Sequence, residues 1–265
     1  MSGQWLKTCR AMLALSALLL VLPWAMPVRA AGLVDTIKIV KPSIVGIGVH
    51  SPLGRPVNQL IGTGFVVMDG KHALTNMHVV RDRTQPGDGK ALAVFIGNGN
   101  AVEFREAEIV ATDPDHDVAL LSFSGDALPS LKLGGALIVQ EGMDIAFTGF
   151  PIGAVYGLHP VTHKGMVSAI TPIAIPQNST RSLDTNMIRR LQEVFNVFQL
   201  DATAYPGNSG SPVFAADTGE VVAIVSSVFV KETKEAALTD PSGITFAIPI
   251  QYALRLVNKV KDKTP

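Results

Sequence analysis

The stretch "PGNSGSP", Pro206 to Pro212, is a small polar loop between two runs of apolar residues. "VFQLDATAY" precedes it and "VFAADTGEVVAIVSSVFV" follows it, and both runs are typical of β-strands. Such a loop can be an ordinary hairpin turn, because Asn, Ser and Gly are common turn residues for steric reasons. It can also present a side chain for chemistry. The rest of the chain decides between these two interpretations.

Short β-branched segments separated by Gly, Pro, Asn or Asp recur on both sides of a linker, "LPSLKLGGALIVQEG". The segments before it are "SIVGIGVHS", "GTGFVVMDG", "HALTNMHVV", "ALAVFIGNG", "EFREAEIVATDP" and "VALLSFS". Those after it are "MDIAFTGFP", "GLHPVTHKGMVSAI", "FNVFQLDAT", "GSPVFAAD", "EVVAIVSSVFV" and "GITFAIPI". Six such segments on each side of the linker predict an all-β fold of two six-stranded antiparallel β-barrels, at about 34–125 and about 140–250.

Two segments have apolar residues at helical rather than strand spacing. "TNMIRRLQEVFNVF", within 176–198, places Met187, Leu191, Val194 and Phe195 on one side and predicts a short inserted helix. "IQYALRLVNKVKD" is amphipathic, with Tyr252, Leu256 and Val257 opposite its lysines, and predicts a C-terminal helix at about 250–262.

The first thirty residues predict a secretory signal peptide. A start that carries Lys7 and Arg10 is followed by the apolar run "AMLALSALLLVL", and Val28 and Ala30 occupy the places of an A-x-A-like cleavage site. The apolar run is short for a membrane span, although an uncleaved anchor is the alternative. We therefore expect an exported protein, periplasmic or secreted, with no stable membrane span after cleavage.

Composition limits the chemistry of the exported chain. Its single cysteine, Cys9, is lost with the signal peptide, which excludes disulfides, a thiol nucleophile and cysteine-ligated metal. Loss of Lys7, Arg10 and Arg29 leaves 19 basic against 22 acidic residues. Nothing in this balance suggests nucleic-acid binding, which would require a basic stripe. We expect neither a cofactor nor a metal.

One histidine has a setting suited to catalysis. The chain has six, none paired at a metal-binding spacing: His50, His72, His78, His116, His159 and His163. His78 is predicted to end the strand "HALTNMHVV", where a rigid sheet would hold a general base beside a cleft. His72 begins the same strand and is predicted at a turn.

The acidic run "DPDHDVALLSF" offers a partner for that histidine. Asp117 directly precedes an apolar strand, so its carboxylate is predicted at the barrel edge, half-buried and pointing inward. A buried carboxylate needs a polar partner, and an imidazole N–H supplies one while fixing the tautomer that a catalytic histidine requires. Asp113 and Asp115 have a simpler explanation, which is that they solvate a loop.

The order His78, Asp117, Ser209 resembles that of the trypsin-like serine peptidases, specifically the HtrA/Deg branch. The resemblance covers about 34–257 and rests on "GTGFVV", "ALTNMHVV", "HDVALL", "TGFP", "GMVSA", "PGNSGSP" and "GITFAIP". It implies a serine endopeptidase that acts on exported or unfolded proteins and peptides through an acyl-enzyme intermediate. Ser209 is then the nucleophile, His78 the general base and Asp117 the group that orients His78.

The resemblance also assigns the residues around the nucleophile. The loop Gly207, Asn208, Ser209 is expected to form the oxyanion hole, with the backbone N–H groups of Gly207 and Ser209 as donors. The primary substrate pocket is expected to be lined by Thr203, Ala204, Tyr205, Val225, Ser226, Ser227 and Val228. None of these is acidic, so a small or medium apolar substrate side chain is favoured over Lys or Arg.

Three features depart from the family pattern. Ser211 stands where relatives usually have a second glycine after the nucleophile. No PDZ domain is expected, because the sequence ends at Pro265 soon after the predicted terminal helix. The segment 176–198 is longer than expected, and a regulatory role for it is a hypothesis, as is a homo-oligomer.

Two other functions stay open at this point. A trypsin-like fold can serve as a noncatalytic peptide-binding or chaperone module, although such a module usually lacks one member of the triad. A lipase or esterase also uses Ser, His and Asp, but in the order Ser, Asp, His and with the serine on a strand-to-helix elbow. Here a predicted strand follows the serine.

Overall fold

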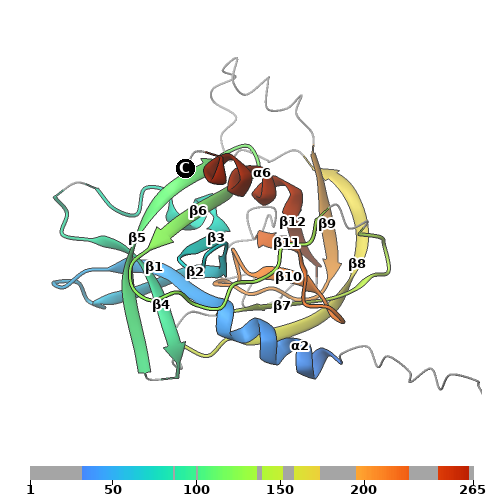
Figure 1. Cartoon of the computed structure of the whole chain (residues 1–265), viewed down its shortest axis with the longest axis horizontal. Coiled ribbons are helices and arrows are strands. Elements are labelled where there is room, and N and C mark those ends of the chain that lie inside the picture. The colour runs from blue at the N-terminus through green and yellow to red at the C-terminus, as the bar shows by residue number, and fades with distance from the viewer. Residues whose placement is uncertain are drawn as a thin grey trace, which may run out of the picture. The chain divides into compact units, whose positions relative to one another are not determined.

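The computed structural model of the protein describes residues 32–85, 87–99, 101–135, 139–151, 158–173, 195–226 and 244–262. The first half contains α2 (Leu33–Val40), η1 (Lys41–Ser43), β1 (Ile44–His50), β2 (Asn58–Val67), β3 (His72–Asn76), α3 (Met77–Val80), β4 (Ala91–Asn98), β5 (Ala101–Asp113) and β6 (Val118–Phe123). The second half contains β7 (Asp144–Gly149), β8 (Val161–Ile173), β9 (Phe195–Asp201), β10 (Pro212–Ala215), β11 (Val221–Ser226), β12 (Ile244–Pro249) and α6 (Ile250–Lys261). Figure 1 shows their arrangement.

Each set of six strands closes into a barrel. The first barrel has the order β1-β2-β3-β6-β5-β4 and the second β10-β11-β12-β9-β8-β7, and neighbouring strands run antiparallel. Closure satisfies the strand edges that an open sheet would leave unpaired. The predicted all-β fold with two six-stranded barrels is confirmed.

The core has three parts. One apolar cluster fills the first barrel and includes Ile47 and Leu121, and another fills the second barrel and includes Phe147 and Leu200. A third cluster contains residues of both barrels and of α6. Burial of this shared apolar surface stabilises the contact between the barrels, so loops from either one can be held in a fixed relation.

The C-terminal helix α6 closes this shared core. It buries Tyr252, Leu256 and Val257 and leaves Lys259 and Lys261 exposed, which confirms the predicted amphipathic pattern. Its neighbours are β5 and β6 of the first barrel and β11 and β12 of the second. The helix therefore bridges the two barrels, as its place across their upper ends in Figure 1 shows.

The predicted inserted helix is wrong at its end. Phe195, which the helical spacing included but which also begins the predicted strand "FNVFQLDAT", is the first residue of β9 and pairs with Ile173 of β8, so the strand prediction is confirmed there. Pairing with β8 on one side and β12 on the other holds β9 extended and overrides the local apolar spacing. The rest of that prediction, 174–194, lies outside the described residues, as does the predicted signal peptide, 1–30.

Two short helices have no counterpart in the sequence prediction. The eight-residue α2 buries Thr36 and Val40, and the Thr36 hydroxyl donates to the carbonyl oxygen of Asp217 at 3.4 Å. The four-residue α3 carries His78. No helix in the described part of the chain is long and apolar enough to cross a membrane.

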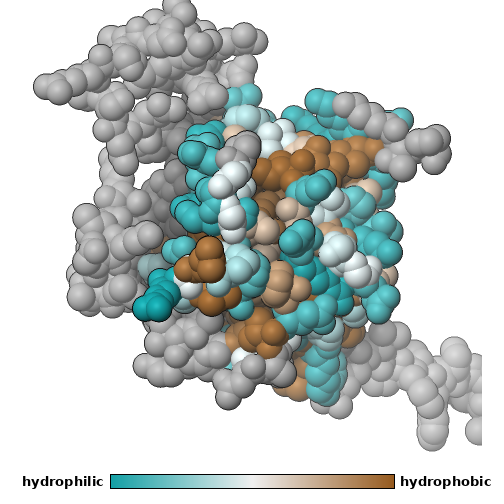
Figure 2. Space-filling model, turned by 90° about the vertical axis from the view of Figure 1, so that its left-hand side faces the viewer, coloured by the Kyte–Doolittle hydropathy of each residue, from teal (hydrophilic) through white to brown (hydrophobic). Residues whose placement is uncertain are grey.

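The outer face of the first barrel carries scattered apolar side chains. Val102, Phe104, Ile109 and Val110 of β5 are exposed, and Figure 2 shows apolar patches interrupted by polar residues on this side of the molecule. The ring of Phe104 stacks on that of His50 with 3.8 Å between the ring centres. This face is therefore broken up by polar groups.

Candidate active site

His78 lies just beyond β3, not on it. The last pair between β3 and β6 joins Asn76 to Val118, and the next N–H along the chain, that of Met77, donates to the carbonyl oxygen of Asp117 at 3.1 Å. The side-chain amide of Asn76 donates to the same oxygen at 3.1 Å. These bonds end the strand ladder at Asn76. The prediction that His78 ends a strand is wrong by two residues, because the chain turns into α3 there.

Asp117 directly precedes β6 and turns its carboxylate towards His78. Its φ of 53° lies in the left-handed region, which Asp adopts more readily than most residues. One carboxylate oxygen accepts the backbone N–H of His78 at 2.9 Å, and the other lies 2.7 Å from its Nδ1. A carboxylate only accepts, so Nδ1 carries the proton and Nε2 is left as the acceptor of a neutral ring. The predicted contact between Asp117 and His78 is present.

Ser226 adds a third donor from the second barrel. It is the last residue of β11, fully buried, and its hydroxyl donates to Asp117 Oδ2 at 3.2 Å. The sequence placed Ser226 in the substrate pocket, whereas the structure gives its hydroxyl this carboxylate contact. Sequence reasoning missed it, since the 109 residues between the two positions carry no local signal.

The loop that carries Ser209 contains a type II β-turn. The N–H of Asn208 donates to the carbonyl oxygen of Tyr205 at 3.0 Å, and Gly207 has a φ of 100°. Pro206 stands at the second position, where its fixed φ suits the turn, and glycine at the third, where positive φ is required. Ser209 follows this turn and is 5% exposed.

Backbone bonds tie the loop to both barrels. The carbonyl oxygen of Ser209 accepts from Thr63 of β2 at 2.8 Å, and the N–H of Gly210 donates to Val225 of β11 at 3.0 Å. A Cβ placed on Gly62 would lie 2.9 Å from Val79 and 3.0 Å from the Ser209 carbonyl oxygen. The residue next to His78 and the backbone of Ser209 therefore flank the same glycine.

Ser211, the departure from the family pattern, is accommodated by a glycine on β7. Ser211 and Asn208 are both fully buried, and their side-chain polar atoms have no hydrogen-bond partner in the described part of the chain. A Cβ on Gly149 would collide with the Ser211 hydroxyl and would lie 2.9 Å from Asn208 Oδ1. The extra hydroxyl fits because residue 149 has no side chain.

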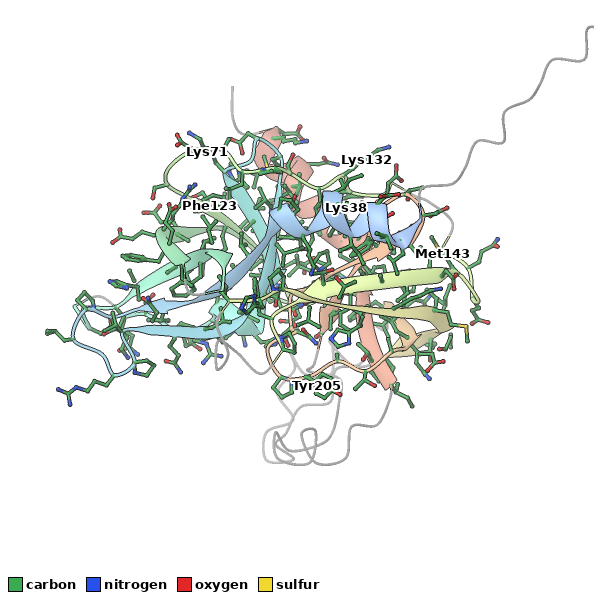
Figure 3. The ribbon with its side chains drawn as sticks, turned by 90° about the horizontal axis from the view of Figure 1, so that it is seen from below. Lys38, Lys71, Phe123, Lys132, Met143 and Tyr205 are labelled. Atoms are coloured by element: carbon green, nitrogen blue, oxygen red, sulfur yellow. The ribbon has the colours of Figure 1, made fainter. Side chains whose placement is uncertain are left out.

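The other predicted pocket residues fall into three groups. Thr203, Ala204 and Tyr205 are half-buried, and Figure 3 shows Tyr205 at the junction of the barrels, away from Lys38 and Lys132. The buried Val225 accepts the N–H of Gly210, as described above. Ser227 and Val228 lie outside the described residues.

His163 lies beside Tyr205 and was not singled out by the sequence. Its ring stacks on Phe147 at 4.8 Å between centres and lies 6.0 Å from that of Tyr205. Burial lowers the pKa of His163, which keeps the imidazole neutral at pH 7. Its Nε2 is buried with no hydrogen-bond partner among the described residues. Nothing in the local sequence distinguishes His163 from other strand histidines, so its place beside Tyr205 could not be predicted.

A second histidine–aspartate pair lies on the same loop as Asp117. His116 Nδ1 is 2.8 Å from Asp113 Oδ2, and its ring stacks on Tyr252 at 3.7 Å between centres. Burial by itself raises the pKa of Asp113, but the hydrogen bonds and charge of His116 outweigh it and hold that pKa below its usual value. The interpretation of Asp113 as a loop-solvating carboxylate is incomplete, because Asp113 pairs with His116.

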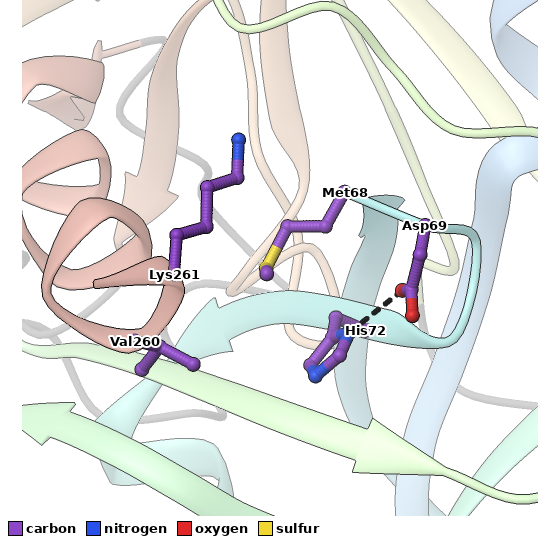
Figure 4. Close-up of a pocket in the computed structure, with 5 residues that line it drawn as sticks. All are labelled: Met68, Asp69, His72, Val260 and Lys261. Carbon is purple, nitrogen blue, oxygen red and sulfur yellow. Dashed lines mark hydrogen bonds and ion pairs between the residues drawn. The ribbon is translucent and has the colours of Figure 1, made fainter. Parts of the chain in front are cut away.

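A surface pocket of about 380 Å³ lies apart from these groups, between the β2–β3 turn and α6. Figure 4 shows its lining, Met68, Asp69, His72, Val260 and Lys261. His72 Nδ1 lies 2.7 Å from Asp69 Oδ1, at the opposite end of β3 from His78.

Within the described ranges, no three His, Cys, Asp or Glu side chains cluster as metal ligands would.

Two antiparallel barrels, with a His–Asp pair on one and a serine loop on the other, define the class of the trypsin-like peptidases. The chain belongs to the family described as trypsin-like peptidase domain, whose model matches residues 62–224.

Named relatives agree with this family. The chain is 34% identical over 203 residues to a protein of Pseudomonas putida named "Probable periplasmic serine endoprotease DegP-like", and 32% identical to one of that name from Halomonas elongata. The matches cover 77% and 76% of this chain but 35% of each relative, so the chain spans about a third of the length of these proteins.

Solved structures share the fold. The HtrA-type protease AlgW with a decapeptide aligns with a TM-score of 0.61 at 19% identity and covers 88% of this chain and 68% of that one. The active form of the Rv3671c protease from M. tuberculosis aligns with a TM-score of 0.62 at 20% identity, over 85% and 83% of the two chains. At these identities the likeness concerns the fold alone.

Proposed function

We propose that this protein is an exported serine endopeptidase, with Ser209 as nucleophile, His78 as general base and Asp117 as the group that orients His78. The observation that carries the proposal is the buried carboxylate of Asp117, which takes donors from His78 and from Ser226 of the other barrel. This arrangement leaves Nε2 of His78 as the acceptor on the side of the ring away from Asp117.

In the proposed reaction, Ser209 Oγ attacks the carbonyl carbon of a peptide bond while His78 Nε2 takes the hydroxyl proton. The tetrahedral intermediate collapses, the C–N bond breaks, and His78 returns the proton to the leaving amine. Water then attacks the acyl-enzyme and loses a proton to His78, the bond from the acyl carbon to Ser209 Oγ breaks, and His78 returns that proton to Ser209 Oγ as the acid product leaves. Asp117 stays ionised and stabilises the charged imidazole.

The turn at Gly207 supports the assignment of the oxyanion hole to Gly207, Asn208 and Ser209. In this proposal the backbone N–H groups of Gly207 and Ser209 donate to the developing oxyanion. The N–H of Gly207 has no protein acceptor among the described residues. Loss of one such donor typically costs about 10²–10³ in rate.

The expected substrates are exported or unfolded proteins. The relatives named above are called periplasmic serine endoproteases, and the predicted signal peptide gives this chain the same destination. The described residues assigned to the pocket, Thr203, Ala204, Tyr205, Val225 and Ser226, carry no acidic group. We therefore propose cleavage after small or medium apolar side chains.

A fluorophosphonate probe and a casein digest test the proposal together. Wild-type protein is expected to label on Ser209 and to cleave unfolded casein, and Ser209→Ala to lose labelling and nearly all cleavage while staying folded. Residual catalysis of roughly 10³ over water is expected from binding and the oxyanion donors. Circular dichroism confirms the fold of each variant.

Ser211→Ala is the matched control, because it removes a hydroxyl two residues away that has no partner among the described residues. It is expected to label and cleave like the wild type. Labelling without cleavage of casein or peptides favours an esterase, and absence of both favours a noncatalytic binding module. Either result contradicts the proposal.

A further inference from the structure

Thr63 connects the first barrel to the nucleophile loop of the second. It lies in β2 and is fully buried. Its backbone N–H donates to the carbonyl oxygen of Ser209 at 2.8 Å, and its hydroxyl donates to that of Gly207 at 2.7 Å. One residue thus binds the loop on both sides of Asn208.

The direction of the hydroxyl bond is fixed by a second partner. The backbone N–H of Phe150 donates to Thr63 Oγ1 at 3.0 Å, and Phe150 directly follows β7. Because the carbonyl of Gly207 can only accept, the threonine proton must point at it. The bonds therefore run from Phe150 through Thr63 to Gly207, without an alternative arrangement of the hydroxyl.

Thr63 is itself held by a second buried threonine. The hydroxyl of Thr75, in β3, donates to the carbonyl oxygen of Thr63 at 2.7 Å, and Thr75 is fully buried. A Cβ on Gly210 would collide with that same carbonyl oxygen and with the Thr75 hydroxyl. The loop is therefore packed directly onto these two threonines.

The contact at Gly207 acts on the turn that presents the proposed oxyanion donors. The peptide between Gly207 and Asn208 is bonded at both ends, its carbonyl by Thr63 and its N–H by Tyr205. These two bonds fix the plane of the Gly207–Asn208 peptide and the position of the Gly207 Cα, the atom next to the Gly207 N–H.

We propose that the Thr63 hydroxyl is a positioning group that keeps the Gly207 N–H directed at the oxyanion. The inference rests on the proposed function, since an oxyanion has meaning only in a peptidase. Thr63 itself is not proposed to contact the substrate. It acts through the loop, so its loss should weaken transition-state binding more than substrate binding.

Two matched pairs of side chains test the role of the hydroxyl. Thr63→Val keeps the shape and removes the hydroxyl, and Thr63→Ser and Thr63→Ala differ from each other by the hydroxyl alone. In each pair the variant without the hydroxyl is expected to show kcat lower by about 10- to 100-fold, with KM within about 3-fold. Rates are measured on a peptide substrate at low temperature and divided by the folded fraction.

Thr148→Val is the control for losing a buried hydroxyl, because Thr148 is also fully buried but bonds to Thr162 on the neighbouring strand. It should leave kcat unchanged. The pH dependence of kcat should also be unchanged in the Thr63 variants, because the bonds of Thr63 go to the nucleophile loop, Thr75 and Phe150 and not to His78.

The outcomes are distinct. If wild-type protein neither labels with fluorophosphonate nor cleaves peptide, the proposed function fails. If it does both, and Thr63→Val or Thr63→Ala matches its hydroxyl-bearing partner in kcat per folded molecule, the role of Thr63 is overturned. Loss of folded protein with unchanged kcat per folded molecule overturns it as well, because the hydroxyl then serves stability only.

Discussion

Two histidine–aspartate pairs, whose aspartates are four residues apart, have nearly the same geometry. His78 donates its backbone N–H at 2.9 Å and approaches with Nδ1 at 2.7 Å to Asp117, and His116 does the same to Asp113 at 3.2 and 2.8 Å. The close contact alone therefore does not mark a catalytic site.

The surroundings of the two pairs differ. Asp113 and His116 are three residues apart, and the His116 ring lies against Tyr252 and Phe195, inside the packing of α6. His78 and Asp117 are 39 residues apart, and Ser226 of the other barrel completes the carboxylate's set of donors. Long-range assembly distinguishes the proposed catalytic pair from the structural one, as does a His78 ring that stacks on no aromatic side chain among the described residues.

The strongest test of this comparison exchanges each carboxylate for an amide. Asp117→Asn is expected to lower kcat by about 10⁴-fold, because an amide can donate to Nδ1 and thereby favour the wrong tautomer. Asp113→Asn is expected to leave kcat within about 2-fold. Peptide cleavage by both folded variants is the measurement, and equal losses in the two would show that the pairs are not functionally distinct.

A second test addresses the structural pair through its aromatic neighbour. Tyr252→Ala removes the ring on which His116 stacks and is expected to lower the free energy of unfolding by about 3 kcal/mol. Arg255→Ala, which removes an exposed guanidinium 5.4 Å from the same ring, should cost about 0.5 kcal/mol. Denaturant unfolding measures both. A change in kcat of the folded Tyr252→Ala protein would contradict the separation of roles.

A third test concerns the donor that only the proposed catalytic pair receives. Ser226→Ala removes one of the three hydrogen bonds that the Asp117 carboxylate makes with described residues, and we expect kcat to fall about 10-fold, as for loss of one bond to a charged group. Ser43→Ala is the matched control, because that serine is also buried but has no partner among the described residues. If both variants behave alike, the contact from the second barrel has no bearing on catalysis.

The smallest expected effect is on stability in acid. The pKa of Asp113 is lowered, so the unfolded chain binds a proton more tightly at this site than the folded one does. Its contribution to stability is therefore complete above the ordinary value of 3.8 and is lost as the pH falls below it. Asp113→Asn should lose stability less steeply than wild type in this range. Unfolding midpoints at several pH values test this, with the exposed Asp126→Asn as control.

The sequence predicts the parts of this protein that have local patterns. Alternating apolar residues and turn residues locate the strands, and the barrels follow from their number and spacing. His78 and Asp117 were identified because each borders a strand, and the structure brings them into contact. The roles assigned to them and to Ser209 remain proposals.

Other parts have no such pattern. The signal in α2 is mixed: "IKIV" alternates as a strand would, whereas Leu33, Thr36 and Val40 recur at helical spacing, and burial of Thr36 and Val40 favours the helix. Thr63 looks like any β-branched strand residue, and Ser226 like a strand end. Their partners are 144 and 109 residues away, and such contacts are decided by how the barrels pack.

These long separations bear on when the molecule becomes active during its own synthesis and export. Closing a loop between distant residues costs entropy before the contact is made, so we expect the bonds of Thr63 to Gly207 and of Asp117 to Ser226 to form late in folding. The first barrel carries the proposed base and the second the proposed nucleophile, so an emerging chain holds one without the other. Under the proposed mechanism, a chain that is incompletely synthesised or incompletely exported is unable to cleave other proteins. On that mechanism, the proposed ability to cleave unfolded protein arises only once the chain is itself folded.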